Sequence, residues 1–132
     1  MNVFPKSILI ADDEKDFRDL CRFVLEPLGF KITTAGNGEE ALNMVKQQTF
    51  DLLILDVHMP YMGGLDVWAK IRGIRPKQKV IMISNGIKKN DPRAKAIREG
   101  VSAYLFKPFG MYELIASIER CLGINLGIGG VL

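Results

Sequence analysis

Polar side chains that can bind metals or phosphate follow the short apolar runs of this sequence. Asp12 and Asp13 come after the first run, Asp56 after the third and Lys107 after the fifth, while Ser84 ends the fourth. In open sheets of parallel strands, ligands bind beyond the carboxyl ends of the strands. We therefore expect these five side chains to converge on one acidic site that also holds an ammonium group and a hydroxyl.

The mutual repulsion of three carboxylates indicates what this site binds. Two unit charges ~4 Å apart cost about 4 kcal/mol at an effective dielectric of ~20. A cation removes that cost, and an all-oxygen ligand set favours Mg²⁺ over zinc. Asp13 and Asp56 would be its main ligands, with Asp12 acting through a water.

The same groups are suited to phosphoryl transfer. A carboxylate can act as the nucleophile and form an acyl phosphate. The negative charge on the transferred group then needs cations and hydrogen-bond donors, which Mg²⁺, Lys107 and Ser84 would supply. The electrostatic argument leaves open which acid is the nucleophile.

Five short runs alternate with helical patterns, which predicts an α/β fold. The third and fourth runs are almost wholly apolar, as expected of strands covered on both faces of a parallel sheet. Five βα repeats imply a doubly wound parallel sheet. Pro27 is expected to end or kink the first helix. The expected strands are Ser7–Ala11, Lys31–Ala35, Leu52–Leu55, Val80–Ser84 and Ala103–Phe106.

The composition indicates one soluble globular domain. The 132 residues are 48% hydrophobic and 25% charged, and the net charge of +3 is too mild to indicate nucleic-acid binding. We expect a domain over residues 1–122 and a C-terminal tail over residues 123–132. No export signal or membrane-length apolar run is expected. Cys21 and Cys121 match no metal-ligand spacing, so we expect reduced thiols and a cytoplasmic location.

Four motifs together resemble the response-regulator receiver domains of two-component signalling systems. The stretch Asp56–Gly63, with sequence DVHMPYMG, is similar to the family pattern D-x-x-M-P-x-M. The pair Asp12-Asp13, Ser84 and the stretch Lys107–Phe109 match other signature positions of the family. The resemblance covers about residues 6–122. It implies a flavodoxin-like sheet with strand order 2-1-3-4-5 and five helices.

The resemblance also assigns roles to individual residues. Asp56 would be the phosphoacceptor. Asp12, Asp13, Asp56 and the backbone carbonyl of His58 would form the Mg²⁺ site. His58 occupies a variable loop position, and we hypothesise that its side chain influences the lifetime of the acyl phosphate.

Further roles fall on the last two strands. Ser84 would bind a phosphoryl oxygen, and Lys107 would pair with the phosphate. Tyr104 matches the aromatic position that turns inward as Ser84 moves toward the phosphate. The Lys107–Pro108 peptide is expected to be cis. Asn85 departs from the small residue usual at its position, and we hypothesise that it too affects the acyl-phosphate lifetime.

The resemblance implies a signalling module and not an enzyme for an external metabolite. A histidine kinase or phosphotransfer protein would donate the phosphoryl group, and the domain would assist its own phosphorylation and dephosphorylation. The face of the fourth helix, fifth strand and fifth helix would contact an output domain or a target protein. Basic residues over 88–98 border that face and would attract an acidic partner. Direct binding of nucleic acid or membrane is not expected.

Two alternatives remain open at this point. A degenerate receiver would act as a binding platform that is never phosphorylated. A Mg²⁺-dependent phosphohydrolase of the haloacid dehalogenase type would use Asp12 as the nucleophile, with Glu14 as a poor match for its general acid.

Overall fold

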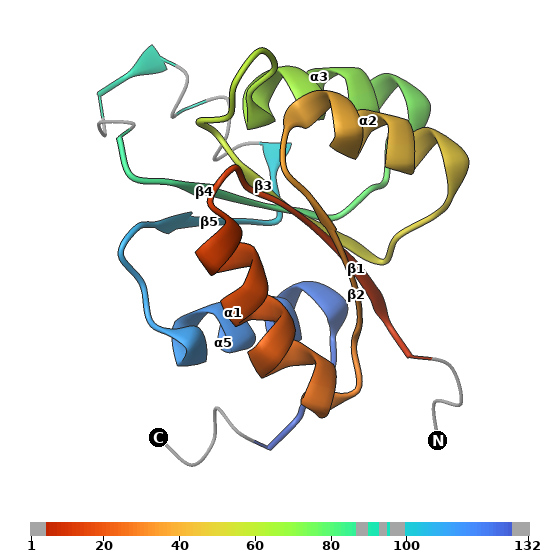
Figure 1. Ribbon diagram of the computed structural model, residues 1–132, viewed down its shortest axis with the longest axis vertical. Coiled ribbons are helices and arrows are strands. Elements are labelled where there is room, and N and C mark those ends of the chain that lie inside the picture. The colour runs from red at the N-terminus through yellow and green to blue at the C-terminus, as the bar shows by residue number, and fades with distance from the viewer. Residues whose placement is uncertain (1–4, 87–89, 93–94, 96–99, 128–132) are drawn as a thin grey trace.

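A five-stranded parallel sheet lies between two layers of helices in the computed structural model, which describes residues 5–86, 90–92, 95 and 100–127 (Figure 1). The strand order is β2-β1-β3-β4-β5, as predicted. The elements are β1 Ser7–Ala11, α1 Lys15–Leu25, the 3₁₀ helix η1 Glu26–Leu28, β2 Lys31–Ala35, α2 Gly38–Gln47, β3 Leu52–Asp56, α3 Gly64–Ile74, β4 Val80–Ser84, β5 Ala103–Phe106 and α5 Met111–Leu122.

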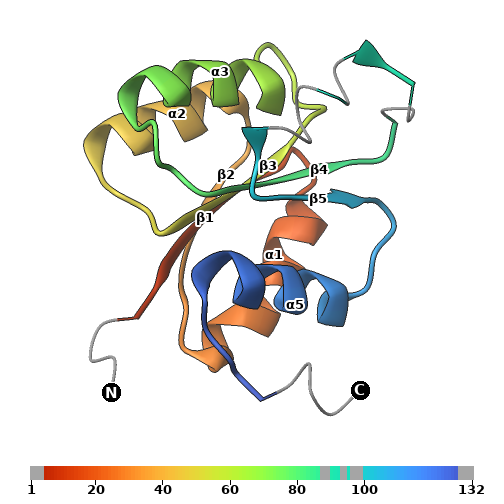
Figure 2. The ribbon, with the colours of Figure 1, turned by 180° about the vertical axis from the view of Figure 1, so that it is seen from behind.

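Helices cover both faces of the sheet, with α1 and α5 on one side and α2 and α3 on the other (Figures 1 and 2). β3 and β4 are buried at every position, which explains their almost wholly apolar sequences. Alternate side chains of β3 pack into two separate cores. Leu53 and Leu55 pack toward α2 and α3, whereas Leu52 and Ile54 pack toward α1 and α5.

The described residues hold four α-helices, whereas five were expected. The expected fourth helix lies between β4 and β5, where most of residues 87–99 are outside the described part of the chain. Four residues of the predicted basic cluster, namely Lys88, Lys89, Arg93 and Arg98, lie outside it as well. Among the described helices, none combines the length and the apolar character that crossing a membrane would require.

Local signals in the sequence fix two helix boundaries. α1 ends directly before the 3₁₀ turn that contains Pro27, as predicted. The Asn37 side chain accepts a hydrogen bond from the Glu40 backbone N–H at 2.8 Å, and the Glu40 carboxylate accepts one from the Gly36 N–H at 3.1 Å. These bonds satisfy amide groups at the start of α2.

Two glycines allow helices to approach the end of β3. A Cβ on Gly64, the first residue of α3, would overlap the backbone oxygen of Asp56. A Cβ on Gly38, the first residue of α2, would overlap the backbone oxygen of Met62. The loop after Asp56 is therefore packed between two helix starts that tolerate no side chain.

Candidate functional site

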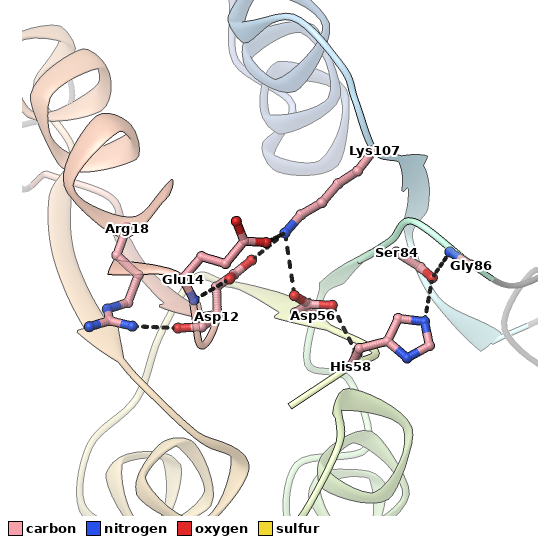
Figure 3. A network of polar contacts seen from close by, with 8 residues as sticks. All are labelled: Asp12, Glu14, Arg18, Asp56, His58, Ser84, Gly86 and Lys107. Carbon is pink, nitrogen blue, oxygen red and sulfur yellow. Dashed lines mark hydrogen bonds and ion pairs between the residues drawn. The ribbon is translucent and has the colours of Figure 1, made fainter. Parts of the chain in front are cut away.

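The carboxyl ends of four strands bring the predicted residues to one edge of the sheet (Figure 3). Asp12 follows β1 and Lys107 follows β5, while Asp56 and Ser84 are the last residues of β3 and β4. The sequence placed Asp56 just after its strand, but the ladder extends one residue further and pairs Asp56 with Ile83. These ladders fix the relative positions of residues distant in sequence.

The Lys107 ammonium faces three carboxylates. Its Nζ lies 2.9 Å from Asp12 Oδ2, 3.1 Å from Glu14 Oε1 and 3.4 Å from Asp56 Oδ2. It also lies 4.7 Å from the ring centroid of Phe17. Burial lowers the pKa of Lys107, but its hydrogen bonds to Asp12 and Glu14 outweigh that effect and the net shift of the pKa is upward. Lys107 is therefore a fixed cation at the centre of the site.

Asp56 is a buried carboxylate that is only 4% exposed. Its Oδ1 accepts a hydrogen bond from the His58 backbone N–H at 2.9 Å. Burial raises the pKa of Asp56 to about 6, and the neighbouring Asp12 adds to the rise, while the His58 N–H and the charge of Lys107 oppose it. Asp56 is thus mostly ionised at neutral pH and only partly solvated.

Asp12 is fully buried and held by hydrogen bonds from its own loop and from α1. Its Oδ1 accepts the Glu14 backbone N–H at 2.8 Å, and its backbone oxygen accepts a bond from Arg18 Nη1 at 2.7 Å. The guanidinium of Arg18 packs over Gly36 and lies on the far side of Asp12 from Asp56 (Figure 3). Arg18 thereby fixes the backbone of the β1–α1 loop, which carries Asp12, Asp13 and Glu14.

Four acidic side chains at this edge form an oxygen-rich group. Asp12, Asp13, Glu14 and Asp56 each offer one carboxylate oxygen, and these four atoms lie within 4.8 Å of one another. Such hard oxygen donors suit Mg²⁺. Sequence reasoning missed Glu14 as a partner of Lys107. Its place next to the Asp12-Asp13 pair was the available signal, but its contact with Lys107 depends on how the β1–α1 loop turns.

The Ser84 hydroxyl is held on the side away from Lys107. Its Oγ is buried, accepts a hydrogen bond from the Gly86 N–H at 3.1 Å, and lies 3.2 Å from His58 Nε2 (Figure 3). The β3–α3 loop and the end of β4 are therefore joined by a side-chain hydrogen bond, which the sequence did not predict. Asn85 is exposed, and its hypothesised effect on the acyl-phosphate lifetime stays a prediction.

Tyr104 packs with the core on the α2 and α3 side of the sheet. Its ring meets that of Phe106 edge to face, with centroids 4.6 Å apart. Its hydroxyl is buried and has no hydrogen-bond partner among the residues that the structure describes. A buried hydroxyl without a partner is costly. The role of Tyr104 as a switch stays a prediction.

Other reactive or basic groups have structural explanations. Burial raises the pKa of the Cys21 thiol to about 12, so that thiol stays protonated. A groove of about 550 Å³ at the opposite edge of the sheet is lined by Arg75 and Lys79, among others. Arg75 donates to the Val45 oxygen and Lys79 to the Cys121 oxygen, so both cations serve helix C-terminal carbonyls.

The doubly wound parallel sheet and the acidic site around Lys107 are those expected of a receiver domain, and sequence comparison agrees. The chain matches the response regulator receiver domain family over residues 8–119 and belongs to that family. The predicted Lys107–Pro108 cis peptide is present.

Three similar proteins illustrate the family. The chain is 36% identical to an uncharacterized 14.6 kDa protein of the sodA1 3′ region of Leptolyngbya boryana, covering 87% of this chain and 89% of that one. It is 36% identical to the DNA-binding transcriptional regulator NtrC of Azospirillum brasilense, covering 90% of this chain but only 24% of NtrC. The response regulator TrrA of Thermotoga maritima, solved in complex with Mg²⁺–BeF, superposes with a TM-score of 0.79 at 33% identity, covering 89% of this chain and 99% of that one.

Proposed function

We propose that Asp56 accepts a phosphoryl group from a phosphohistidine of a histidine kinase or phosphotransfer protein, in a Mg²⁺-dependent reaction that takes place in the cytoplasm. The supporting observation is the convergence of a buried nucleophile with a cation at the sheet edge. Lys107 Nζ lies 3.4 Å from Asp56 and 2.9 Å from Asp12. Membership of the receiver family favours Asp56 over Asp12 as the acceptor.

The transfer proceeds by displacement at phosphorus. An Asp56 carboxylate oxygen attacks the phosphorus atom, the P–N bond to the donor histidine breaks, and its electron pair stays on the ring nitrogen. With a proton on its other nitrogen, the ring leaves as neutral imidazole. Lys107 then pairs with one oxygen of the new acyl phosphate and the Ser84 hydroxyl donates to another.

Asp13, Asp56 and the His58 backbone carbonyl would hold Mg²⁺, and Asp12 would act through a water. Asp13 is exposed, and within the described part of the chain its carboxylate has no partner, so it is available as a ligand. When bound, the ion neutralises charge on the carboxylates and on the phosphoryl oxygens. Lys107 is then able to leave Asp12 for the phosphate.

The donor protein would dock on the rim beside α1. Leu20 and Phe23 of α1 are 46% and 80% exposed. Next to them a groove of about 310 Å³ is lined mainly by apolar residues, with Phe17 and Phe109 among them, and it reaches Lys107. A donor imidazole has to approach Asp56 over this edge, so burial of the apolar rim would favour the encounter complex.

The chain would act as a signalling module that assists its own phosphorylation and later hydrolysis. Ser84 and Tyr104 would move once the phosphoryl group offers new acceptor oxygens, which shifts a conformational equilibrium. Phe106 on β5 and Tyr112 on α5 are each 55% exposed and would belong to the surface that an output domain or target protein contacts.

Chemical phosphorylation tests the proposal. The chain is incubated with Mg²⁺ and acetyl phosphate, and the acyl phosphate is trapped by borohydride reduction and located by peptide mass spectrometry. We expect label on Asp56 in the wild type and none in Asp56→Asn. Label on Asp12 would support the phosphohydrolase instead, and a folded wild type without any label would support the binding platform.

A further inference from the structure

His58, in the loop after β3, contacts Ser84 at the end of β4. Its backbone N–H donates to Asp56 Oδ1 at 2.9 Å, while its Nε2 lies 3.2 Å from Ser84 Oγ. One residue therefore contacts both the proposed acceptor and the proposed switch hydroxyl. In Figure 3 its ring lies on the far side of Asp56 from Lys107, next to Ser84.

The surroundings of His58 are shaped to accept the imidazole. A Cβ on Gly86 would lie 3.3 Å from His58 Nε2, so a side chain at Gly86 would crowd the ring. The Gly86 N–H donates to the same Ser84 Oγ at 3.1 Å. Ser84 is fully buried, and its hydroxyl is thus engaged from two sides.

We propose that His58 is a positioning residue that holds the Ser84 hydroxyl away from Asp56 in the unphosphorylated protein. This inference rests on the proposed function, because it concerns the phosphorylation of Asp56. The Gly86 N–H donates to Ser84 Oγ, and His58 Nε2 lies on the same oxygen. If Nε2 accepts, the single hydroxyl proton is used in that bond; if Nε2 carries a proton and donates, the hydroxyl proton is free but the Oγ is still held beside His58. In both cases the Ser84 hydroxyl has to leave His58 before it can reach a phosphoryl oxygen.

The hydrogen bond between His58 Nε2 and Ser84 Oγ, which we call the latch, stabilises the conformation of the unphosphorylated protein. It therefore lowers the fraction of molecules that are ready to bind a phosphoryl group. Apparent affinity falls in proportion to that fraction. Removing one neutral hydrogen bond changes such an equilibrium about two- to tenfold. His58→Ala should therefore tighten Mg²⁺-dependent beryllofluoride binding, and speed phosphorylation by acetyl phosphate, by about that factor.

A double-mutant cycle tests the latch. Beryllofluoride affinity is measured by titration, followed through NMR shifts, for wild type, His58→Ala, Ser84→Ala and the double variant, with His58→Gln as the conservative variant. We expect His58→Ala to tighten binding, His58→Gln to restore wild-type affinity, and His58→Ala to have no further effect in the Ser84→Ala background. Thermal unfolding of each variant shows that the fold is kept.

Two results would overturn the inference without touching the proposed function. One is a wild type that binds beryllofluoride while His58→Ala binds equally or more weakly. The other is an effect of His58→Ala that persists in full without the Ser84 hydroxyl, since His58 would then act on access to Asp56. A wild type that neither binds beryllofluoride nor becomes phosphorylated would defeat the proposed function itself, and the latch with it.

Discussion

The contacts of Lys107 show what phosphorylation has to change at the residue scale. Its ammonium pairs with Asp12, Glu14 and Asp56, so it is already satisfied. A phosphoryl group adds about −1.5 to −2 of charge and three acceptor oxygens. That group competes with Asp12 and Glu14 for the same ammonium. Neutralisation of the carboxylates by a metal ion would release Lys107 for the phosphate.

The raised pKa of Asp56 predicts that the free energy of unfolding of the metal-free protein falls as the pH rises. The pKa rises from 3.8 to about 6 through burial, so this group favours the folded state fully below pH 3.8 and loses that contribution as the pH rises through 6. Asp56→Asn removes the charge. We expect the variant to gain about 1–2 kcal/mol over wild type in the free energy of unfolding at pH 7.5, after allowance for residual hydration.

Urea unfolding in EDTA between pH 4 and 7.5 measures this difference. The gain should shrink toward zero at the acid end, where wild-type Asp56 is protonated. A difference that stays constant or grows toward low pH would contradict the assignment of the raised pKa to Asp56.

The buried hydroxyl of Tyr104 predicts a stabilising substitution. Tyr104→Phe removes a polar group that makes no hydrogen bond to any residue in the described part of the chain, and we expect the free energy of unfolding to rise by about 1 kcal/mol. Tyr112→Phe is the matched control, because Tyr112 is 55% exposed and should change little. Chemical denaturation of both variants measures the effect. A loss of stability in Tyr104→Phe would show that the hydroxyl does find a partner in solution.

At the element scale, the start of α3 restricts the loop that follows Asp56. Gly64 contacts the backbone of Asp56, and its N–H donates to the Val57 oxygen at 3.2 Å. The helix can therefore lie directly behind Asp56, the proposed acceptor, and hold its loop. α5 contributes in another way, because it follows Lys107 and packs Leu114 and Ile118 against the sheet.

Two glycines of the same helix should respond in opposite ways to alanine. Gly64→Ala places a Cβ against backbone and should cost more than about 2 kcal/mol of stability. At Gly73 no atom of the described residues lies within 4 Å of an added Cβ, and Gly73→Ala should stabilise by about 0.5–1 kcal/mol through helix propensity. Urea denaturation of both variants checks the pair. Similar effects of both substitutions would mean that α3 can move away from Asp56.

At the scale of the whole molecule, one sheet edge collects the functional groups and the opposite edge carries structural cations. The C-terminal segment takes part in the fold as far as it is described. Ile124 and Leu126 pack on the α1 and α5 side, and the Leu126 N–H donates to the Glu119 carboxylate at 2.7 Å. The sequence predicted a tail beginning at residue 123, and the boundary of the domain at residue 122 stays a prediction.

Metal binding should stabilise the whole domain by mass action. Mg²⁺ at ten times its Kd is expected to raise the free energy of unfolding by about 1.4 kcal/mol, and at a hundred times by about 2.7 kcal/mol. Asp13→Asn should lose most of this gain, yet fold normally, because Asp13 is exposed. Thermal unfolding across a Mg²⁺ series measures it, with Ca²⁺ and Na⁺ for comparison. Equal stabilisation of wild type and Asp13→Asn would exclude Asp13 as a ligand.

The sequence by itself determined the strands, their order along the chain and the residues that reach the functional edge. Apolar runs must be buried, and parallel strands expose their carboxyl ends together, so Asp12, Asp56, Ser84 and Lys107 had to approach one another. The resemblance of the chain to a family added the strand order 2-1-3-4-5, which the hydrogen-bonded ladders confirm.

Only the tertiary structure decided the contacts between loops. Three contacts could not be predicted from local sequence patterns, because each joins residues from different segments of the chain. They are the ion pair of Glu14 with Lys107, the hydrogen bond between His58 and Ser84, and the packing of Gly64 against Asp56. Strand ends follow from periodicity and burial. Loop side chains are placed by the packing of helices that lie far away in sequence, and a shift of one ångström there makes or breaks a hydrogen bond.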